Sequence, residues 1–216
     1  PRVLRVVVHY TTDGADIVGD CQLIGVRQLA TQDEPQRTVH FTGRVRLSKD
    51  DPALEGAESP ARTEPTVSAD AVYAIYFHGP TYQVVHEIWR NGDAVVGAMA
   101  VELPPNHIPE TRARTTTPRL TELAFQTAGV WEIGTAGTMA LPLHIDRVVY
   151  AGDPGNAHGA LHAVVHPNDD GSFDALVLDD AGTAYVALSG YRTVQLPAPI
   201  DSATAAPLRE AMNEEG

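Results

Sequence analysis

Two polar side chains, Glu122 and Gln126, lie four residues apart in a segment with a helical apolar pattern. Positions i and i+4 share a helix face, so a carboxyl and an amide meet on one side of this helix. A carboxyl at a buried site can act as a general acid. A first-turn carboxylate is also favoured by the helix dipole alone, so local physics leaves both interpretations of Glu122 open.

A histidine, His78, stands directly before the pair Gly79-Pro80. The pair predicts a tight backbone next to the imidazole, which a simple turn would also explain. Two extended apolar segments follow, joined by the hairpin signal Asn91-Gly92-Asp93. A hairpin does not need a His-Gly-Pro stretch ahead of it, so the position of His78 requires another explanation.

Three histidines, His158, His162 and His166, have the spacing of metal ligands on a helix. The residues between Gly159 and Pro167 predict a strand instead, in which positions four apart lie about 13 Å from each other. We therefore predict no metal site here. The sequence also lacks Walker, G-x-G-x-x-G and G-x-S-x-G motifs.

The elements expected around these residues are mostly strands. Apolar, partly alternating sequence predicts them at 3–10, 17–29, 38–47, 141–150, 161–166, 172–178 and 184–196. One helix begins at Pro118, with Thr117 as its candidate cap, and is expected to end at Gly134. One helix among many strands, without βαβ alternation, predicts an α+β fold in which antiparallel sheet wraps a helix.

Composition limits the function classes. The chain has 216 residues, 43% of them hydrophobic, and a net charge of −13, which argues against nucleic-acid and acidic-membrane partners. No apolar run approaches the ~18 residues of a membrane helix. The single cysteine, Cys21, excludes an internal disulfide and fits a cytoplasmic protein. Because the chain opens on Pro1 without Met, we expect a piece of a longer protein.

Three stretches, in order, resemble the dehydratase domains of polyketide synthases and of the related polyunsaturated-fatty-acid synthases. His78 to Gln83 is similar to the family's Tyr-Gly-Pro-x-Phe-Gln motif, and Pro118 to Gln126 is similar to its Pro-x-Leu-Leu-Asp-x-x-x-Gln helix. Leu141 to Val148 resembles the Leu-Pro-Phe strand that follows. The likeness covers residues 70–197, and residues 1–48 resemble the rear strands of the family's first hotdog.

The resemblance implies a double hotdog, two helices each wrapped by antiparallel sheet, with an incomplete first half. Residues 1–48 would be rear strands of the first hotdog, and residues 49–70, which contain three prolines and many carboxylates, a linker. Residues 71–198 would form the second hotdog with the catalytic-acid helix. Residues 199–216 would be a C-terminal tail, either a terminal helix or loose chain.

The activity implied is dehydration of 3-hydroxyacyl carrier-protein thioesters to enoyl products, a lyase reaction of polyketide or fatty-acid biosynthesis. Glu122 takes the position of the family's catalytic acid, with Gln126 as its companion. A substrate-binding wall is implied at His78, Gly79, Pro80 and Tyr82. The implied partners are an acyl carrier protein, whose phosphopantetheine carries the substrate, and other domains of the same synthase, with a homodimer left open. No further cofactor is expected.

Two departures from the family pattern bear on activity. The family's general base, a His in a His-x-x-x-Gly-x-x-x-x-Pro motif, is not found in this sequence. Either that base lies upstream of Pro1, or the chain is a non-catalytic dehydratase-like scaffold module of a synthase. In addition, the family's Tyr and Asp are replaced by His78 and Glu122, and the second change is mild because single-hotdog dehydratases use Glu.

A basic run precedes the predicted helix. Arg112, Arg114 and Arg119 form the densest local positive charge in an acidic chain. An acidic carrier protein needs such a patch on an acidic domain, or tethering on the same polypeptide. A helix N-terminus also favours its phosphate. Such charge runs are also often only solvated surface, so both interpretations stay open.

Overall fold

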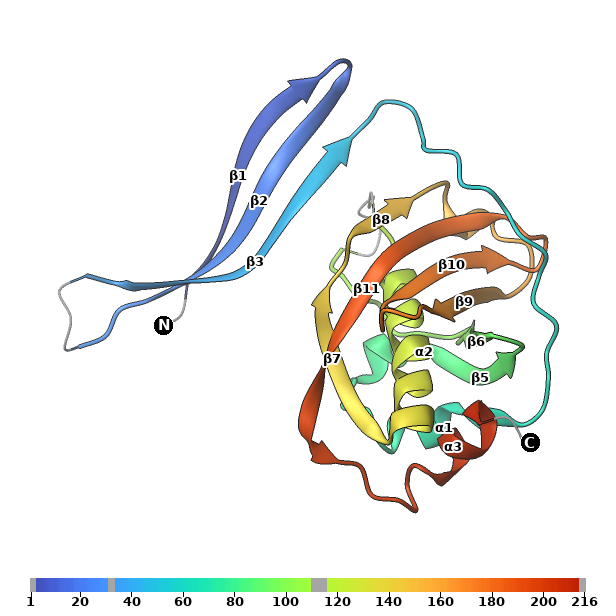
Figure 1. Ribbon diagram of the computed structural model, residues 1–216. Helices are drawn as coiled ribbons and strands as arrows, with labels where there is room; N and C mark the ends of the chain where they lie inside the picture. Colours follow the sequence, from blue (N-terminus) through green and yellow to red (C-terminus); the bar gives the residue numbers. More distant parts are fainter. Residues whose placement is uncertain (1–2, 31–33, 110–115, 214–216) are drawn as a thin grey trace. The chain divides into compact units, whose positions relative to one another are not determined.

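The computed structural model describes residues 3–30, 34–109 and 116–213 (Figure 1). These residues belong to two compact units, Pro1–Asp51 and Pro52–Gly216. The division falls near the start of the linker expected at 49–70, and each unit has a sheet of its own.

The first unit is an antiparallel sheet of three strands in the order β1-β2-β3. The strands are β1 (Val3–Asp13), β2 (Asp16–Arg27) and β3 (Gln36–Leu47). Most of its large apolar side chains are exposed, including Val6 at 72% and Phe41 at 71%. Strand pairing and cross-strand ion pairs such as Arg44–Asp20, rather than a packed core, organise the described part of this unit, which contains no helix.

The second unit contains an eight-stranded sheet in the order β4-β5-β6-β9-β10-β11-β7, with β8 paired to β11. Its strands are β4 (Thr66–Ser68), β5 (Val85–Asn91), β6 (Ala94–Met99), β7 (Thr138–His144), β8 (Arg147–Tyr150), β9 (Leu161–Pro167), β10 (Phe173–Asp179) and β11 (Ala184–Pro199). Its helices are α1 (Ala69–Tyr73), η1 (Pro80–Tyr82), α2 (Pro118–Ala136), η2 (Pro154–Asn156) and α3 (Ala206–Met212). Every strand pair in this sheet is antiparallel.

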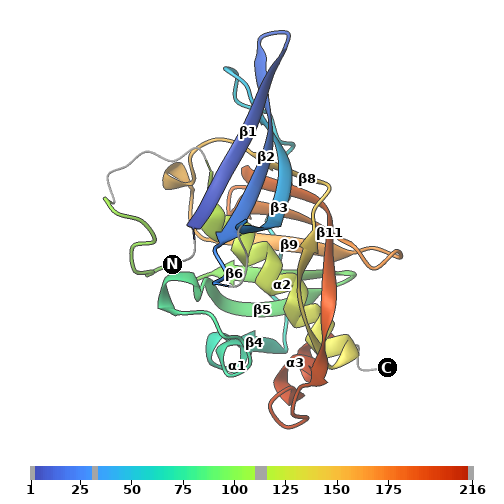
Figure 2. The same ribbon diagram turned by 90° about the vertical axis from the view of Figure 1, so that its left-hand side faces the viewer.

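The long helix α2 lies inside the curve of this sheet (Figures 1 and 2). Leu123 and Ile133 of α2 are at most 1% exposed and belong to one core with Val95, Val165 and Val177 of the strands. Full burial of such side chains contributes about 1.5–3 kcal/mol each. Antiparallel sheet around one helix is the hotdog arrangement, and it confirms the predicted α+β fold class.

The predicted end of the helix was wrong by three residues. α2 runs to Ala136, and its left-handed C-cap is Gly137, with φ of 72°. Gly134 instead lies where α3 crosses α2, because a Cβ there would meet Met212 Cβ at 2.6 Å and the Leu208 carbonyl oxygen at 2.7 Å. At the other end Pro118 is the first helical residue, and the Thr117 side chain makes no capping hydrogen bond.

The segment predicted as a linker is attached to the second unit. Trp89 Nε1 donates to the Ala61 carbonyl at 3.0 Å, and the Arg62 guanidinium binds both carboxylate oxygens of Glu87 at 2.9 Å. Thr66–Ser68 then pairs with β5, so the linker assigned to 49–70 contains a strand and the first residues of α1. Single side-chain contacts hold residues 61–65 in place, and such contacts leave no periodic pattern in the sequence.

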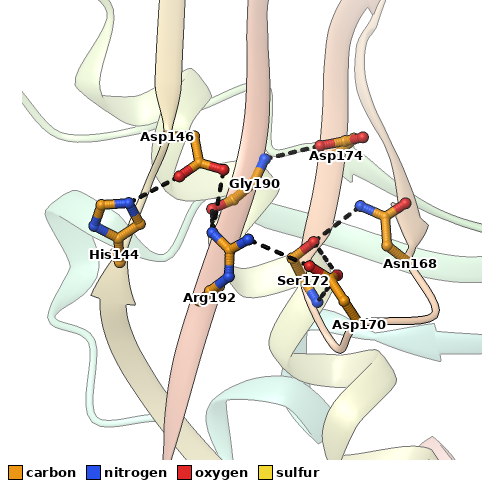
Figure 3. A network of polar contacts seen from close by, with 8 residues as sticks. All are labelled: His144, Asp146, Asn168, Asp170, Ser172, Asp174, Gly190 and Arg192. Atoms are coloured by element: carbon orange, nitrogen blue, oxygen red, sulfur yellow. Dashed lines mark hydrogen bonds and ion pairs between the residues drawn. The ribbon is translucent and has the colours of Figure 1, made fainter.

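A polar network joins the turns at one end of the sheet (Figure 3). The Arg192 guanidinium binds Asp146 at 3.1 Å and Asp170 at 3.3 Å, and His144 binds the other oxygen of Asp146 at 2.9 Å. Asp146 lies between β7 and β8, so the single strand predicted over 141–150 is divided into two. All four side chains are substantially exposed, and such pairs typically contribute below about 1 kcal/mol each.

Candidate active site

The helix and the His-Gly-Pro stretch meet in the structure. His78 Nε2 lies 3.0 Å from Glu122 Oε1, and the two side chains are 21% and 23% exposed. The ring of His78 also stacks on Phe77, with centroids 5.2 Å apart, and meets the edge of Tyr76 at 5.5 Å. The segment around residue 78 and the segment around residue 122, which are far apart in the sequence, therefore place an imidazole against a carboxyl.

Gln126 binds the same carboxylate oxygen. Its Nε2 donates to Glu122 Oε1 at 3.0 Å and to the Tyr82 carbonyl at 2.8 Å. Its Oε1 accepts from the Tyr73 hydroxyl at 2.8 Å, and that hydroxyl in turn accepts from the Val85 backbone N–H at 2.8 Å. Gln126 is only 2% exposed, so this network connects the carboxyl to the core of the second unit.

No pattern in the sequence pointed to Tyr73 or Tyr76. The Tyr76 hydroxyl donates to the Gln126 carbonyl at 3.1 Å and also lies where a Cβ on Gly129 would be 2.3 Å from it. Gly129 therefore lets the tyrosine reach the helix backbone. The aromatic cluster before His78 was the only available hint, and it named no partner.

The Gly-Pro turn is fixed on several sides. Pro80 begins η1, the Tyr82 N–H donates to the Gly79 carbonyl at 2.9 Å, and Gln83 Nε2 donates to the His78 carbonyl at 3.0 Å. The Arg119 guanidinium donates to the Thr81 carbonyl at 3.1 Å and to the Pro104 carbonyl. Arg119 thus joins the start of α2 to η1. Arg112 and Arg114 lie outside the described residues.

Burial controls the ionisation of the surrounding tyrosines. It raises the pKa of Tyr73 to about 12 and the pKa of Tyr76 well above its ordinary value, and it also raises that of Tyr191. All three side chains stay neutral near pH 7, and the hydroxyls of Tyr73 and Tyr76 serve as hydrogen-bonding groups. Burial likewise raises the pKa of Glu132, which accepts a hydrogen bond from Thr193 at 2.5 Å.

The histidines at 158, 162 and 166 do not converge. His162 and His166 lie on β9 as predicted, and His162 Nε2 contacts Asp180 Oδ1 at 2.8 Å. The His158 backbone N–H donates to Asp179. Within the described residues no group of three or more His, Cys, Asp or Glu could hold a metal ion. No described helix is both long and apolar enough to cross a membrane.

Comparison with known proteins identifies the family of this chain. A family model described as the polyketide synthase dehydratase N-terminal domain matches residues 47–203, which is most of the chain. The chain therefore belongs to this dehydratase family. No curated protein gives a significant match.

Solved structures of similar fold are dehydratases of polyketide synthases. One comes from a study of substrate selection by the borrelidin and fluvirucin synthases, with TM-score 0.62, 19% identity, and coverage of 92% of this chain and 67% of that one. The dehydratase domain from the CurK module of the curacin synthase matches with a TM-score of 0.62 and 16% identity, and the match covers 91% of this chain and 69% of that one. A dehydratase domain of a trans-AT polyketide synthase from Brevibacillus brevis matches with a TM-score of 0.59 and 17% identity, and the match covers 90% of this chain and 76% of that one. At these identities the likeness is one of fold.

Proposed function

We propose that this chain dehydrates 3-hydroxyacyl carrier-protein thioesters to enoyl thioesters within a cytoplasmic polyketide or polyunsaturated-fatty-acid synthase. The observation that carries the proposal is the Glu122 carboxyl, held by His78 and Gln126 at 3.0 Å each beside the Gly79-Pro80 turn. Dehydration requires removal of an α-proton and protonation of the leaving hydroxyl, and Glu122 supplies the acid.

Relatives support a chemistry of one carboxyl and one imidazole. An aspartate-to-asparagine mutant and a histidine-to-phenylalanine mutant of the CurK dehydratase are each described as inactive. In this chain Glu122 stands at the acid position of the family motif. Gln126 orients it, and His78, Gly79, Pro80 and Tyr82 form the wall against which the acyl group binds. The substrate arrives on phosphopantetheine, and we propose no other cofactor.

We further propose that the carrier protein docks on Arg112, Arg114 and Arg119. The support is the basic run itself, because an acidic partner needs a local positive surface on a chain of net charge −13. Charge reversal at Arg112 or Arg114 is expected to weaken carrier-protein binding measured in trans, and added salt should weaken it further. Unchanged affinity in both variants, with no effect of salt, would exclude this surface.

A non-catalytic scaffold module is the second candidate, favoured by the absence of the His-x-x-x-Gly-x-x-x-x-Pro motif from this sequence. A dehydration assay separates the two. The chain, alone and within its parent synthase, is incubated with a 3-hydroxyacyl pantetheine thioester, and loss of water is followed by mass spectrometry. Because the family's base motif is absent from this sequence, we expect no turnover by the chain alone. Within the parent synthase we expect turnover that Glu122→Gln abolishes and that Glu210→Gln, on the exposed side of α3, leaves unchanged. No turnover by any of these proteins would favour the scaffold.

A further inference from the structure

We infer that Glu132 is a specificity-determining residue which, together with Thr193, binds a hydroxyl group on the distal part of the acyl chain. The inference rests on the proposed function and deepens it, because it assigns a hydroxylated acyl chain, rather than a plain hydrocarbon chain, to the site at Glu122. It follows from the uncovered face of α2, from the aromatic rings along that face and from the two carboxyl oxygens of Glu132.

One face of α2 is not covered by the sheet of the second unit. Glu122, Phe125, Gly129 and Glu132 are all partly exposed, and their spacing of three or four residues places them on one side of the helix. Most residues between them are buried against the sheet. Glu122 and Glu132 are ten positions apart, which at about 1.5 Å of rise per residue makes this uncovered face about 15 Å long. An acyl chain with its C3 hydroxyl at Glu122 therefore has a surface along which to continue.

Aromatic rings lie between the two carboxyls. Phe125 stacks on Tyr191 of β11, with ring centroids 4.4 Å apart. Burial raises the pKa of Tyr191, and the charges of Glu132 and then of Glu122 raise it further, so this ring lies near both carboxyls. The surface between Glu122 and Glu132 is thus apolar and suits a hydrocarbon segment. Since the carrier protein is proposed to dock at the N-terminal end of α2, the acyl chain extends from Glu122 toward Glu132.

The two oxygens of the Glu132 carboxyl have different surroundings. Oε1 accepts a hydrogen bond from the Thr193 hydroxyl at 2.5 Å, whereas Oε2 is enclosed and has no hydrogen-bond partner in the described part of the chain. An enclosed polar oxygen without a partner destabilises the folded protein, and a hydroxyl group placed beside it removes that penalty. Glu132 as a whole is partly exposed on the uncovered face, so a small rotation of its side chain presents Oε2 to a ligand there.

A hydroxyl group pairs with this carboxyl in either ionisation state. The protonated acid, which burial favours by raising the pKa of Glu132, donates to the hydroxyl oxygen, and the carboxylate accepts a hydrogen bond from the hydroxyl. A methylene group at the same place leaves Oε2 without a partner, so a plain hydrocarbon chain binds more weakly. About 15 Å at roughly 1.2 Å of advance per bond is about twelve bonds, which places the hydroxyl at about C15 of the acyl chain.

Two matched ligands test the inference directly. A 3-hydroxyhexadecanoyl pantetheine amide, and the same compound with a second hydroxyl at about C15, are each titrated into the full chain below their micelle-forming concentrations. Calorimetry gives the affinities, and NMR of the labelled Glu side chains reports where each ligand lies. We expect the doubly hydroxylated ligand to bind about tenfold more tightly, the effect of one hydrogen bond to a buried group, and to shift the signals of both Glu122 and Glu132. Equal affinities would overturn the inference, whereas ligands that leave the Glu122 signal unmoved would contradict the proposed function, and the inference with it.

Substitutions at Glu132 separate recognition of the ligand from a merely structural role. Glu132→Leu removes the hydrogen-bonding group and should reverse the preference, so that the singly hydroxylated ligand binds more tightly. Glu132→Gln keeps a hydrogen-bonding group at the same reach and should keep a preference within about threefold of wild type. Glu210→Gln, exposed on α3, is the matched control and should keep the full preference. An unchanged preference in Glu132→Leu, or an equal loss in both Glu132 variants, would overturn the inference, and if Glu132→Leu does not fold, the wild-type comparison of the two ligands decides alone.

Discussion

Tyr73 connects the candidate site to the core, so Tyr73→Phe tests the stability and the architecture of the site together. The substitution removes one oxygen atom and leaves the ring in place. The Val85 N–H then loses its acceptor and Gln126 Oε1 loses its donor, at residues only 1% and 2% exposed. Gln126 is also freed to rotate, which weakens its hold on Glu122.

The expected loss can be worked from these two contacts. Each buried polar group left without a partner costs about 1–3 kcal/mol, so with partial relaxation we expect the free energy of unfolding to fall by about 3 kcal/mol. For a chain of this size that corresponds to a decrease in Tm of about 6–12 °C. Turnover should fall as well, by about tenfold, because the acid is less well oriented.

Urea unfolding followed by circular dichroism measures the stability change. Tyr10→Phe is the matched control, because Tyr10 is 68% exposed in the first unit and should change stability by less than about 0.5 kcal/mol. If Tyr73→Phe is as stable as the control, the Tyr73–Gln126 connection is not a structural feature of the protein, and the assigned orientation of the Gln126 amide loses its basis.

Three further substitutions test other parts of the structure. Burial raises the pKa of Glu132 in the folded protein, so as pH rises the carboxyl ionises in the unfolded chain, near pH 4.3, before it ionises in the folded one. The free energy of unfolding therefore falls as pH rises above about 4.3, and Glu132→Gln, which removes the ionisation, should raise Tm at pH 8 but not at pH 4. Hydrogen bonds, chiefly from the His158 N–H, lower the pKa of Asp179 to about 2. Asp179→Asn should therefore lower the free energy of unfolding by about 2 kcal/mol at pH 7, and this difference from wild type should disappear as pH falls through about 2. Gly134→Val should cost about 3 kcal/mol by forcing α3 from α2, and an unchanged urea midpoint would contradict the close crossing.

Features with a local cause were predictable from the sequence. The apolar spacing of α2, the Asn91-Gly92-Asp93 turn and the strand predicted at 38–47 each follow from neighbouring residues. The structure contains all three, although β3, the strand at that position, is exposed on both faces. The pairing of Glu122 with Gln126 is also local, since i and i+4 lie on one helix face. Family resemblance added His78, which no periodicity could connect to Glu122.

Features with a distant cause were not predictable. Tyr73 meets Gln126 across 53 positions, and nothing near Tyr73 in the sequence identifies that partner. Gly134 was interpreted as a helix end because a glycine near the end of an apolar run usually is one. Its real reason, the crossing of α3, lies more than 70 residues further on. The contacts of Ala61 and Arg62 with the sheet likewise depend on partners far along the chain.

The central claim is that the 3-hydroxyacyl group binds at Glu122 beside the His78-Gly79-Pro80 turn. Titration of the full chain with a 3-hydroxyacyl pantetheine amide, followed by NMR of the labelled Glu and His side chains, tests it without requiring turnover. The account predicts that the Glu122 carboxyl and His78 signals shift together, saturably, while those of His9 and Glu210 do not. Shifts elsewhere with Glu122 and His78 unmoved would contradict it.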